Sequence, residues 1–172
     1  MKGQMELQHD TRERAPRAGP IQPPWPSKAT ILLVDDNTTL LTSLGKLLVR
    51  AGFWVDLAAS GSHALELLEQ RADTRHAHSL VVTDVVMPGM SGVDLLQQVK
   101  SRWPGLPVLL MTGAGSEGVL RAALRFRCDG YLDKPFGAEE LLVLVRTTLE
   151  REKPVNGQGQ AGPGQDQGVG QG

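Results

Sequence analysis

The sequence is poor in cysteine, in aromatic residues and in long apolar runs. Cys128 is its only cysteine, so an intrachain disulfide is excluded and a reducing compartment is favoured. No apolar run reaches the roughly 20 residues that span a bilayer, and the first residues lack the apolar stretch of a secretory signal peptide. The formal net charge of −1 gives no general attraction to nucleic acid or to a membrane surface. A cytoplasmic protein without direct contacts to either is therefore expected.

Hydrophobic periodicity is absent from both ends of the chain. Residues 1–28 are polar and carry five prolines, and residues 153–172 consist mostly of glycine, glutamine and proline. Such segments bury too little apolar surface to offset the entropy lost on ordering, so both are predicted to be disordered. Residues 29–152 are expected to form the one folded domain.

Within residues 29–152, short apolar runs alternate with amphipathic patterns of helical period. Strands are predicted at residues 31–34, 53–58, 80–83, 108–111 and 131–132. A helical pattern follows each strand; the fourth contains Leu120, Ala123 and Leu124, and either Ser60 or Ser62 could cap the second. Continuous apolar strands joined by helices indicate a parallel sheet covered on both faces. Five such units favour an open, doubly wound α/β sheet over an eight-fold barrel, with ligands beyond the carboxyl ends of the strands.

Polar residues stand where four of the predicted strands end. Asp35 and Asp36 follow the first strand, Asp84 the third, Thr112 the fourth and Lys134 the fifth. Three carboxylates brought together repel one another and coexist most easily around a cation, and an all-oxygen site suits Mg²⁺. A carboxylate beside Mg²⁺ can attack phosphorus, while a lysine and a hydroxyl can stabilise the transferred phosphoryl oxygens. The pattern therefore predicts phosphoryl-transfer chemistry at this end of the sheet.

Four segments of the chain resemble the response regulator receiver family of two-component signalling. They occur in the family's order and at similar intervals, and they read ILLVDDN, VVTDVVMPGMSG, VLLMTG and GYLDKPF. The resemblance covers residues 29–152 and implies a flavodoxin-like (βα)5 sheet with strand order 2-1-3-4-5. No output domain fits after Glu152, so a single-domain, chemotaxis-regulator-like protein is expected.

The resemblance implies a role for each residue of the acidic cluster. Asp84 matches the phospho-acceptor, Asp36 a direct Mg²⁺ ligand, and Asp35 a ligand that acts largely through water. The backbone carbonyl of Val86 matches a further metal ligand. Lys134 matches the lysine that pairs with the phosphoryl group. The implied donor is a histidine kinase or a phosphotransfer protein.

The resemblance also implies a conformational switch. Thr112 would move inward to meet the phosphoryl group, and Tyr131 would turn into the space that it leaves. The surface of the fourth helix, fifth strand and fifth helix would then change for an unknown downstream protein. The peptide bond between Lys134 and Pro135 matches one that is often cis in the family. A signalling switch with slow self-dephosphorylation is expected rather than an enzyme.

The chain departs from the usual family pattern near the fifth strand and beside the acceptor. Arg127 and Cys128 stand where glycine and alanine are frequent, which makes a left-handed helix cap harder to form. Gly137 replaces a frequent capping residue. The side chains that would flank the path of a hydrolytic water are Val86 and Ala114, and neither can orient it. A long-lived phosphorylated state is therefore expected.

Other interpretations of the sequence remain open. The chain could belong to a transcription factor or an enzyme regulator whose output domain is missing. It could be a phosphoaspartyl hydrolase, although Asp84 is followed by Val85-Val86 rather than by an Asp-x-Asp pair. A flavodoxin-like cofactor binder is a third alternative. His76 and His78 are expected to be solvated, and Cys128 to be a small buried apolar residue.

Overall fold

Strands and helices alternate along the described part of the chain. The computed structural model describes residues 29–151, apart from residue 73, residues 75–76 and residues 114–124. The elements in order are β1 (Thr30–Val34), α1 (Thr38–Arg50), β2 (Trp54–Ala58), α2 (Gly61–Arg71), β3 (His78–Asp84), α3 (Gly92–Arg102), β4 (Val108–Thr112), β5 (Gly130–Asp133) and α5 (Ala138–Arg151). The helix predicted around Leu120–Leu124, and both chain ends, lie outside the described residues.

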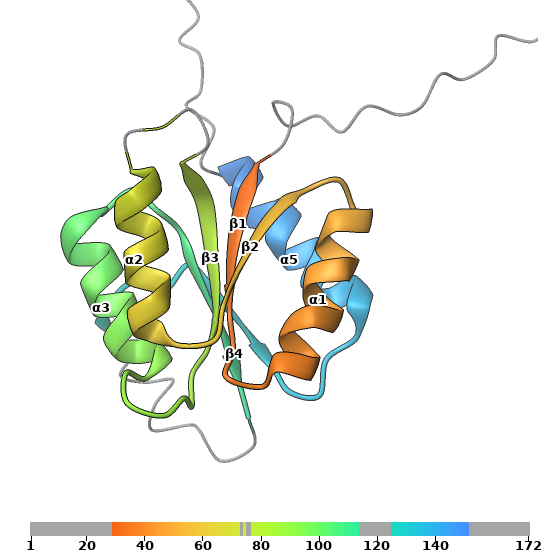
Figure 1. Ribbon diagram of the computed structural model, residues 1–172. Coiled ribbons are helices and arrows are strands. Elements are labelled where there is room, and N and C mark those ends of the chain that lie inside the picture. Colours follow the sequence, from red (N-terminus) through yellow and green to blue (C-terminus); the bar gives the residue numbers. More distant parts are fainter. Residues whose placement is uncertain (1–28, 73, 75–76, 114–124, 152–172) are drawn as a thin grey trace, which may run out of the picture.

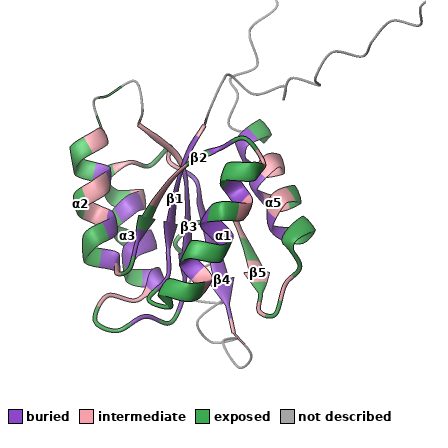
Figure 2. Ribbon diagram, turned by 45° about the vertical axis from the view of Figure 1, so that its right-hand side comes forward, coloured by how far each residue is buried: buried purple, intermediate pink, exposed green. Residues whose placement is uncertain are grey.

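The five strands form one parallel sheet in the order β2-β1-β3-β4-β5, which confirms the predicted fold. Helices α1 and α5 cover one face, and α2 and α3 cover the other (Figure 1). The central strands are buried, whereas the outward faces of the helices are exposed (Figure 2). None of the helices that the structure describes is both long and apolar enough to cross a membrane.

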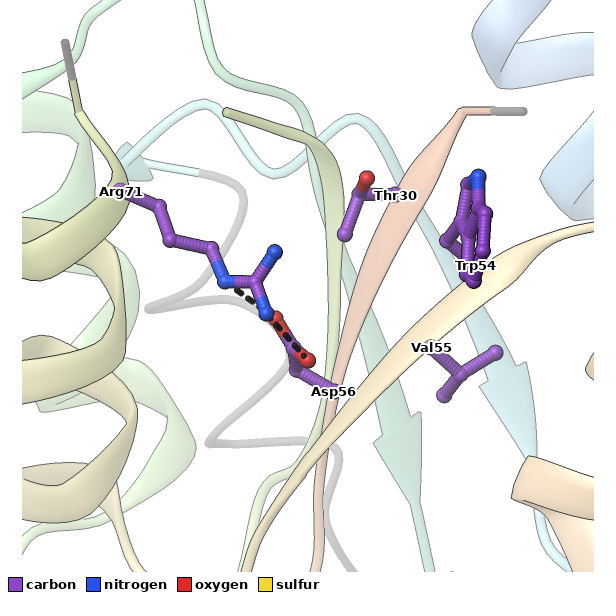
Figure 3. A pocket seen from close by; sticks show the side chains of 5 residues that line it. All are labelled: Thr30, Trp54, Val55, Asp56 and Arg71. Carbon is purple, nitrogen blue, oxygen red and sulfur yellow. Dashed lines mark hydrogen bonds and ion pairs between the residues drawn. The ribbon is translucent and has the colours of Figure 1, made fainter. Parts of the chain in front are cut away.

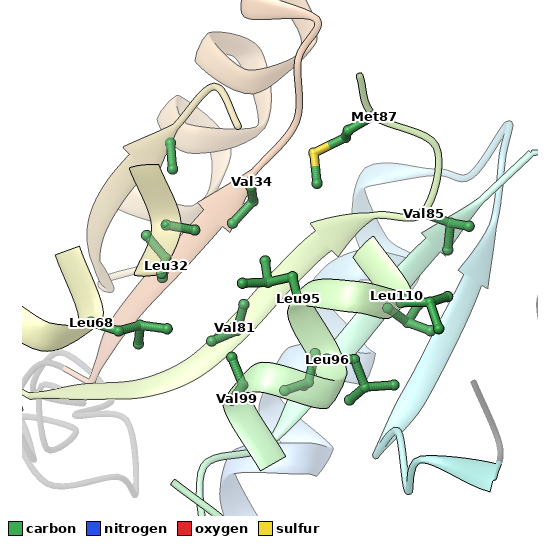
Figure 4. Packing of buried hydrophobic residues seen from close by; sticks show 14 residues of the cluster. Leu32, Val34, Leu68, Val81, Val85, Met87, Leu95, Leu96, Val99 and Leu110 are labelled. Atoms are coloured by element: carbon green, nitrogen blue, oxygen red, sulfur yellow. The ribbon is translucent and has the colours of Figure 1, made fainter. Parts of the chain in front are cut away.

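The core has two halves because the sheet is covered on both faces. Side chains alternate along a strand, so Leu32 and Val34 of β1 enter the cluster beneath α2 and α3, while Ile31 and Leu33 enter the cluster beneath α1 and α5. Figure 4 shows the first cluster, in which strand residues face α3. Each fully buried leucine or valine contributes about 1.5–3 kcal/mol relative to an exposed one. This explains why the strands read as continuous apolar runs.

Three of the helices begin at polar caps. The Asn37 side chain accepts a hydrogen bond from the N–H of Leu40 at the start of α1. Ser60, rather than Ser62, caps α2. Ser91 and Asp94 form a reciprocal capping box at α3. Such caps contribute about 1 kcal/mol each, so these turns after the strands are firmly defined.

The amino end of the sheet, where the strands begin, holds a charged cluster. Arg71 of α2 donates from Nε and Nη2 to the Asp56 carboxylate, at 2.9 and 3.0 Å (Figure 3). His78 Nε2 lies 2.9 Å from the same carboxylate, and its side chain is only 1% exposed. The prediction that His78 is solvated was therefore wrong, because Asp56 compensates its burial; His76 lies outside the described residues. Trp54 begins β2 and Trp103 follows α3, so both also lie at this end.

Candidate functional site

The carboxyl end of the sheet, where the strands finish, brings three carboxylates together. Asp35 follows β1, Asp36 comes next, and Asp84 is the last residue of β3, the neighbour of β1. One carboxylate oxygen from each lies within 4.8 Å of the others. Asp35 is 1% exposed and Asp84 is also buried, whereas Asp36 is open to solvent. The convergence predicted from the strand ends is therefore present.

Lys134 joins two of these carboxylates. Its Nζ lies 3.0 Å from Asp35 Oδ2 and 2.9 Å from Asp84 Oδ1. The other Asp35 oxygen accepts the backbone N–H of Asn37 at 2.8 Å. Both oxygens of the buried Asp35 carboxylate thus have donors, as a buried charge requires.

Burial and charge shift the pKa values within this cluster in a consistent way. Burial raises the pKa of the Asp84 carboxyl and the nearby Asp35 carboxylate adds to this, while Lys134 opposes both. For Lys134, burial lowers the pKa, but its hydrogen bonds and charge pairing with Asp84 and Asp35 outweigh burial and raise it. Lys134 is therefore held as a cation between the carboxylates.

The donor set of the cluster suits a divalent cation. Three carboxylates against one ammonium group leave an excess of two negative charges when all are ionised. The donors are all oxygen, and one of them, on Asp36, faces solvent, so water ligands could complete the shell. These properties match Mg²⁺, which takes one or a few carboxylates and keeps several waters.

The loop between β3 and α3 fixes the backbone of Asp84. Val85 and Met87 are buried, which leaves Val86 between them with 68% of its surface exposed. The Gly92 N–H donates to the Val85 carbonyl at 3.0 Å and closes the loop. A Cβ on Gly92 would lie 2.0 Å from the carbonyl oxygen of Asp84, so only glycine permits this approach.

Thr112 ends β4 and is buried, and its hydroxyl donates to the Asp133 carboxylate. The Lys134 N–H donates to the Thr112 carbonyl at 2.6 Å, so two hydrogen bonds join the ends of β4 and β5. Sequence reasoning did not identify Asp133 as a partner. The signal that could have found it is the register of β4 and β5, which pairs Thr112 with Asp133.

The remaining residues singled out from the sequence lie along or beside β5. Tyr131 is exposed and lies on the same side of β5 as Asp133, two residues on. The Lys134–Pro135 peptide is cis, as predicted. Arg127 has a φ of 58°, so the left-handed turn forms without glycine. Cys128 is half-buried against the cluster beneath α2 and α3; Ala114 lies outside the described residues.

Comparison with known proteins identifies similar sequences. A family model described as response regulator receiver domain matches residues 31–146. "Response regulator MprA" of Mycolicibacterium vanbaalenii is 38% identical over 132 residues, which are 76% of this chain and 54% of that protein. The protein of the same name from Mycobacterium leprae is 38% identical over 72% of this chain and 52% of its own length. The chain thus spans about half the length of these curated relatives.

Solved structures agree with the sequence comparison. The crystal structure of a response regulator receiver domain protein from Clostridium thermocellum has a TM-score of 0.68 and 30% identity, over 72% of this chain and 96% of that one. A CheY-like receiver domain protein from Methanospirillum hungatei has a TM-score of 0.67 and 28% identity, over 73% and 97%. The chain therefore belongs to the response regulator receiver domain family, whose members serve phosphorylation-based two-component signalling.

Proposed function

We propose that Asp84 accepts a phosphoryl group from a phosphohistidine of a histidine kinase or a phosphotransfer protein in the cytoplasm. The observation that carries this proposal is the bridge of Lys134 Nζ between Asp35 and Asp84, beside the third carboxylate of Asp36. An Asp84 oxygen, the Lys134 ammonium group and the other two carboxylates thus lie together, which supports the proposal. Family membership supports the same assignment.

In the proposed reaction, a carboxylate oxygen of Asp84 attacks phosphorus in line with the donor nitrogen. The new O–P bond forms as the N–P bond breaks, and the bonding electron pair returns to the imidazole of the donor. Lys134, 2.9 Å from Asp84 Oδ1, is placed to stabilise charge on the transferred oxygens. Mg²⁺, held by Asp36, Asp84 and the Val86 carbonyl, with Asp35 acting through water, would screen the negative charge while bound.

The acyl phosphate carries about −2 charge where the free carboxylate carried −1, and it brings three acceptor oxygens to a buried position. We expect Thr112 to turn toward these oxygens and Tyr131 to follow into the vacated space. The face that includes β5 and α5 would then bind a downstream protein without direct nucleic-acid contacts. In this role the chain is a switch rather than an enzyme.

Labelling with a small phosphoryl donor tests the assignment. The full chain is incubated with acetyl phosphate and Mg²⁺, and the acid-labile phosphate is mapped by mass spectrometry. One phosphoryl group on Asp84 is expected, with none in Asp84→Asn or without divalent cation, and ordinary labelling in Glu139→Gln, which removes an exposed carboxylate of α5. Undiminished labelling of Asp84→Asn would refute the proposal.

The same assay tests the domain boundaries. We propose that residues 29–152 form the receiver domain and that residues 1–28 and 153–172 contribute nothing to phosphate acceptance. A chain trimmed to residues 29–152 should be labelled at the rate of the full chain. A large loss of labelling in a folded trimmed chain would contradict this boundary.

A further inference from the structure

Asp133 is an exposed carboxylate that binds a buried group of the site. The Thr112 hydroxyl lies at the carboxyl end of β4, almost wholly inaccessible to solvent, and its proton is donated to Asp133. The β4–β5 register places the two residues opposite each other, on one side of the sheet. Asp133 is not one of the three carboxylates of the acidic cluster.

A threonine hydroxyl has one proton and can donate it to one acceptor at a time. While Thr112 donates to Asp133, the same proton is not available to an oxygen of a phosphoryl group on Asp84. Donation to Asp133 and donation to the phosphoryl group are therefore mutually exclusive, and whatever stabilises the first opposes the second.

We propose that Asp133 is a positioning residue that holds the Thr112 hydroxyl in the resting state and thereby lowers the affinity of the site for a phosphoryl group. This inference rests on the proposed function of Asp84. Asp133 acts through Thr112 and does not itself touch the phosphoryl group. When Thr112 leaves, the Asp133 carboxylate regains water because it is exposed, so no buried charge is left unpaired.

The neighbouring contacts explain how the hydroxyl can move without disturbing the strand pair. The Lys134 N–H donates to the Thr112 carbonyl at 2.6 Å, and turning the hydroxyl does not break this bond because it uses only backbone atoms. Lys134 also keeps its place between Asp35 and Asp84 through its own side chain. The exchange of partners is thus confined to the Thr112 side chain.

The probe for this inference is beryllofluoride with Mg²⁺, a non-covalent mimic of the phosphoryl group, with binding to the full chain followed by ¹⁹F NMR. Asp133→Ala removes the competing acceptor and should bind the probe about fivefold more tightly than the wild type. This change in affinity corresponds to the net free energy of a typical hydrogen bond. Asp133→Asn keeps a weaker, uncharged acceptor, so its affinity for the probe should lie between the affinities of Asp133→Ala and the wild type. Glu139→Gln, which removes an exposed charge from α5, should match the wild type.

A double-mutant cycle separates the hydrogen bond from a general charge effect. Thr112→Val keeps the shape of the side chain but has no hydroxyl, so adding Asp133→Ala to it should leave the affinity unchanged. Equal tightening by Asp133→Ala in both backgrounds would assign the effect to charge and overturn the inference, as would an Asp133→Ala affinity equal to that of the wild type. Failure of the wild type to bind the probe, or binding that survives in Asp84→Lys, would instead overturn the proposed function itself.

Discussion

Arg127 occupies a backbone conformation that side chains disfavour. Its φ of 58° lies in the left-handed region, where a Cβ costs about 1–2 kcal/mol. Glycine avoids this cost but loses about 0.5–1 kcal/mol more backbone entropy on folding. We therefore expect Arg127→Gly to raise the free energy of unfolding by about 0.5–1 kcal/mol in urea titrations.

A matched control lies two residues earlier. Arg125 is also an exposed arginine, but it is the last residue of a helical turn, so Arg125→Gly should lower the free energy of unfolding, by at most about 1 kcal/mol. Both variants lose the same charge. If Arg127→Gly is destabilised as much as Arg125→Gly, the turn does not carry the strain inferred from its φ.

Val86 offers the second prediction at the scale of single residues. Family resemblance places its side chain beside the path of a hydrolytic water, and valine cannot orient that water. Val86→Asn and Val86→Glu should therefore speed dephosphorylation of the isolated phosphorylated chain, by up to roughly 100-fold if positioning is the main catalytic effect. The decay of the acyl phosphate is measured with Mg²⁺ present.

The control for this effect is Val49→Asn, which changes another exposed valine, on α1. The acyl phosphate of this variant should decay at the wild-type rate. If the acyl phosphate decays no faster in either Val86 variant than in the wild type, water positioning by residue 86 does not limit hydrolysis.

Some single residues could be placed from the sequence, and others could not. The convergence of Asp35, Asp36 and Asp84 was predictable because parallel strands finish at the same end of a sheet. The partner of Thr112 was not, because pairing across strands depends on register, which a strand-by-strand interpretation does not contain. His78 was misassigned for a similar reason, since Asp56, 22 residues earlier in the chain, compensates its burial.

At the scale of elements, the first turn of α3 constrains the backbone of Asp84, the proposed acceptor. Because a Cβ on Gly92 would meet the Asp84 carbonyl oxygen, Gly92→Ala must displace either the helix or Asp84. We expect a loss of about 1–3 kcal/mol in the free energy of unfolding, as for overpacking, together with slower labelling of Asp84.

Gly105 provides the comparison for Gly92, because a Cβ there would meet nothing within 4 Å. Gly105→Ala should be labelled and unfold like the wild type. Wild-type labelling and stability in Gly92→Ala would mean that the loop relaxes without moving Asp84.

The cluster that joins α2, β2 and β3 should make stability depend on pH. Burial lowers the pKa of His78, and although Asp56 opposes this through its hydrogen bond and charge, the net shift is downward. The unfolded chain then binds a proton more readily than the folded one. The contribution of His78 is therefore present above its ordinary pKa of 6.5 and is lost as the pH falls below it.

The measurement compares the wild type with His78→Gln, whose amide can still donate to Asp56. Between about pH 8 and about pH 5.5, the free energy of unfolding should fall more in the wild type than in the variant. Comparing the two chains cancels the opposite contribution of Asp84, whose raised pKa favours the folded state on acidification. Equal slopes in the two chains would assign the pH dependence to other groups.

The extent of the elements was predictable to within a few residues, but their arrangement was only partly so. The apolar runs located all five strands, and β3 begins two residues earlier than predicted, at His78, which pairs in register with Thr30 of β1. Strand order came from family resemblance, since the apolar pattern alone does not specify which strands are neighbours. β1 pairs with β3 as well as with β2, and the pairing with β3 depends on contacts between residues that are distant in sequence.

At the scale of the whole molecule, the acidic cluster should couple cation binding to stability. A ligand that binds only the folded state stabilises it, by about 1.4 kcal/mol at a Mg²⁺ concentration tenfold above Kd. The melting temperature should then rise by about 3–6 °C relative to NaCl at matched ionic strength.

Asp36→Asn tests the origin of this effect. Removing one of three mutually repelling carboxylates should raise the melting temperature without divalent cation, and it should abolish most of the increment that Mg²⁺ gives. Glu139→Gln should retain the full increment. An Mg²⁺ increment of wild-type size in Asp36→Asn would show that the cation binds elsewhere.

The placement of Trp54 and Trp103 at the amino end of the sheet has a spectroscopic consequence. Trp54 and His78 both pair in register with Thr30, and β3 runs from His78 to Asp84, a span of about 20 Å. Trp103 lines a pocket together with His78, so neither indole is close enough for an ion or a phosphoryl group at the carboxyl end to quench its emission by contact. A change in the emission of either indole on loading the site would instead report a rearrangement transmitted along the length of the sheet.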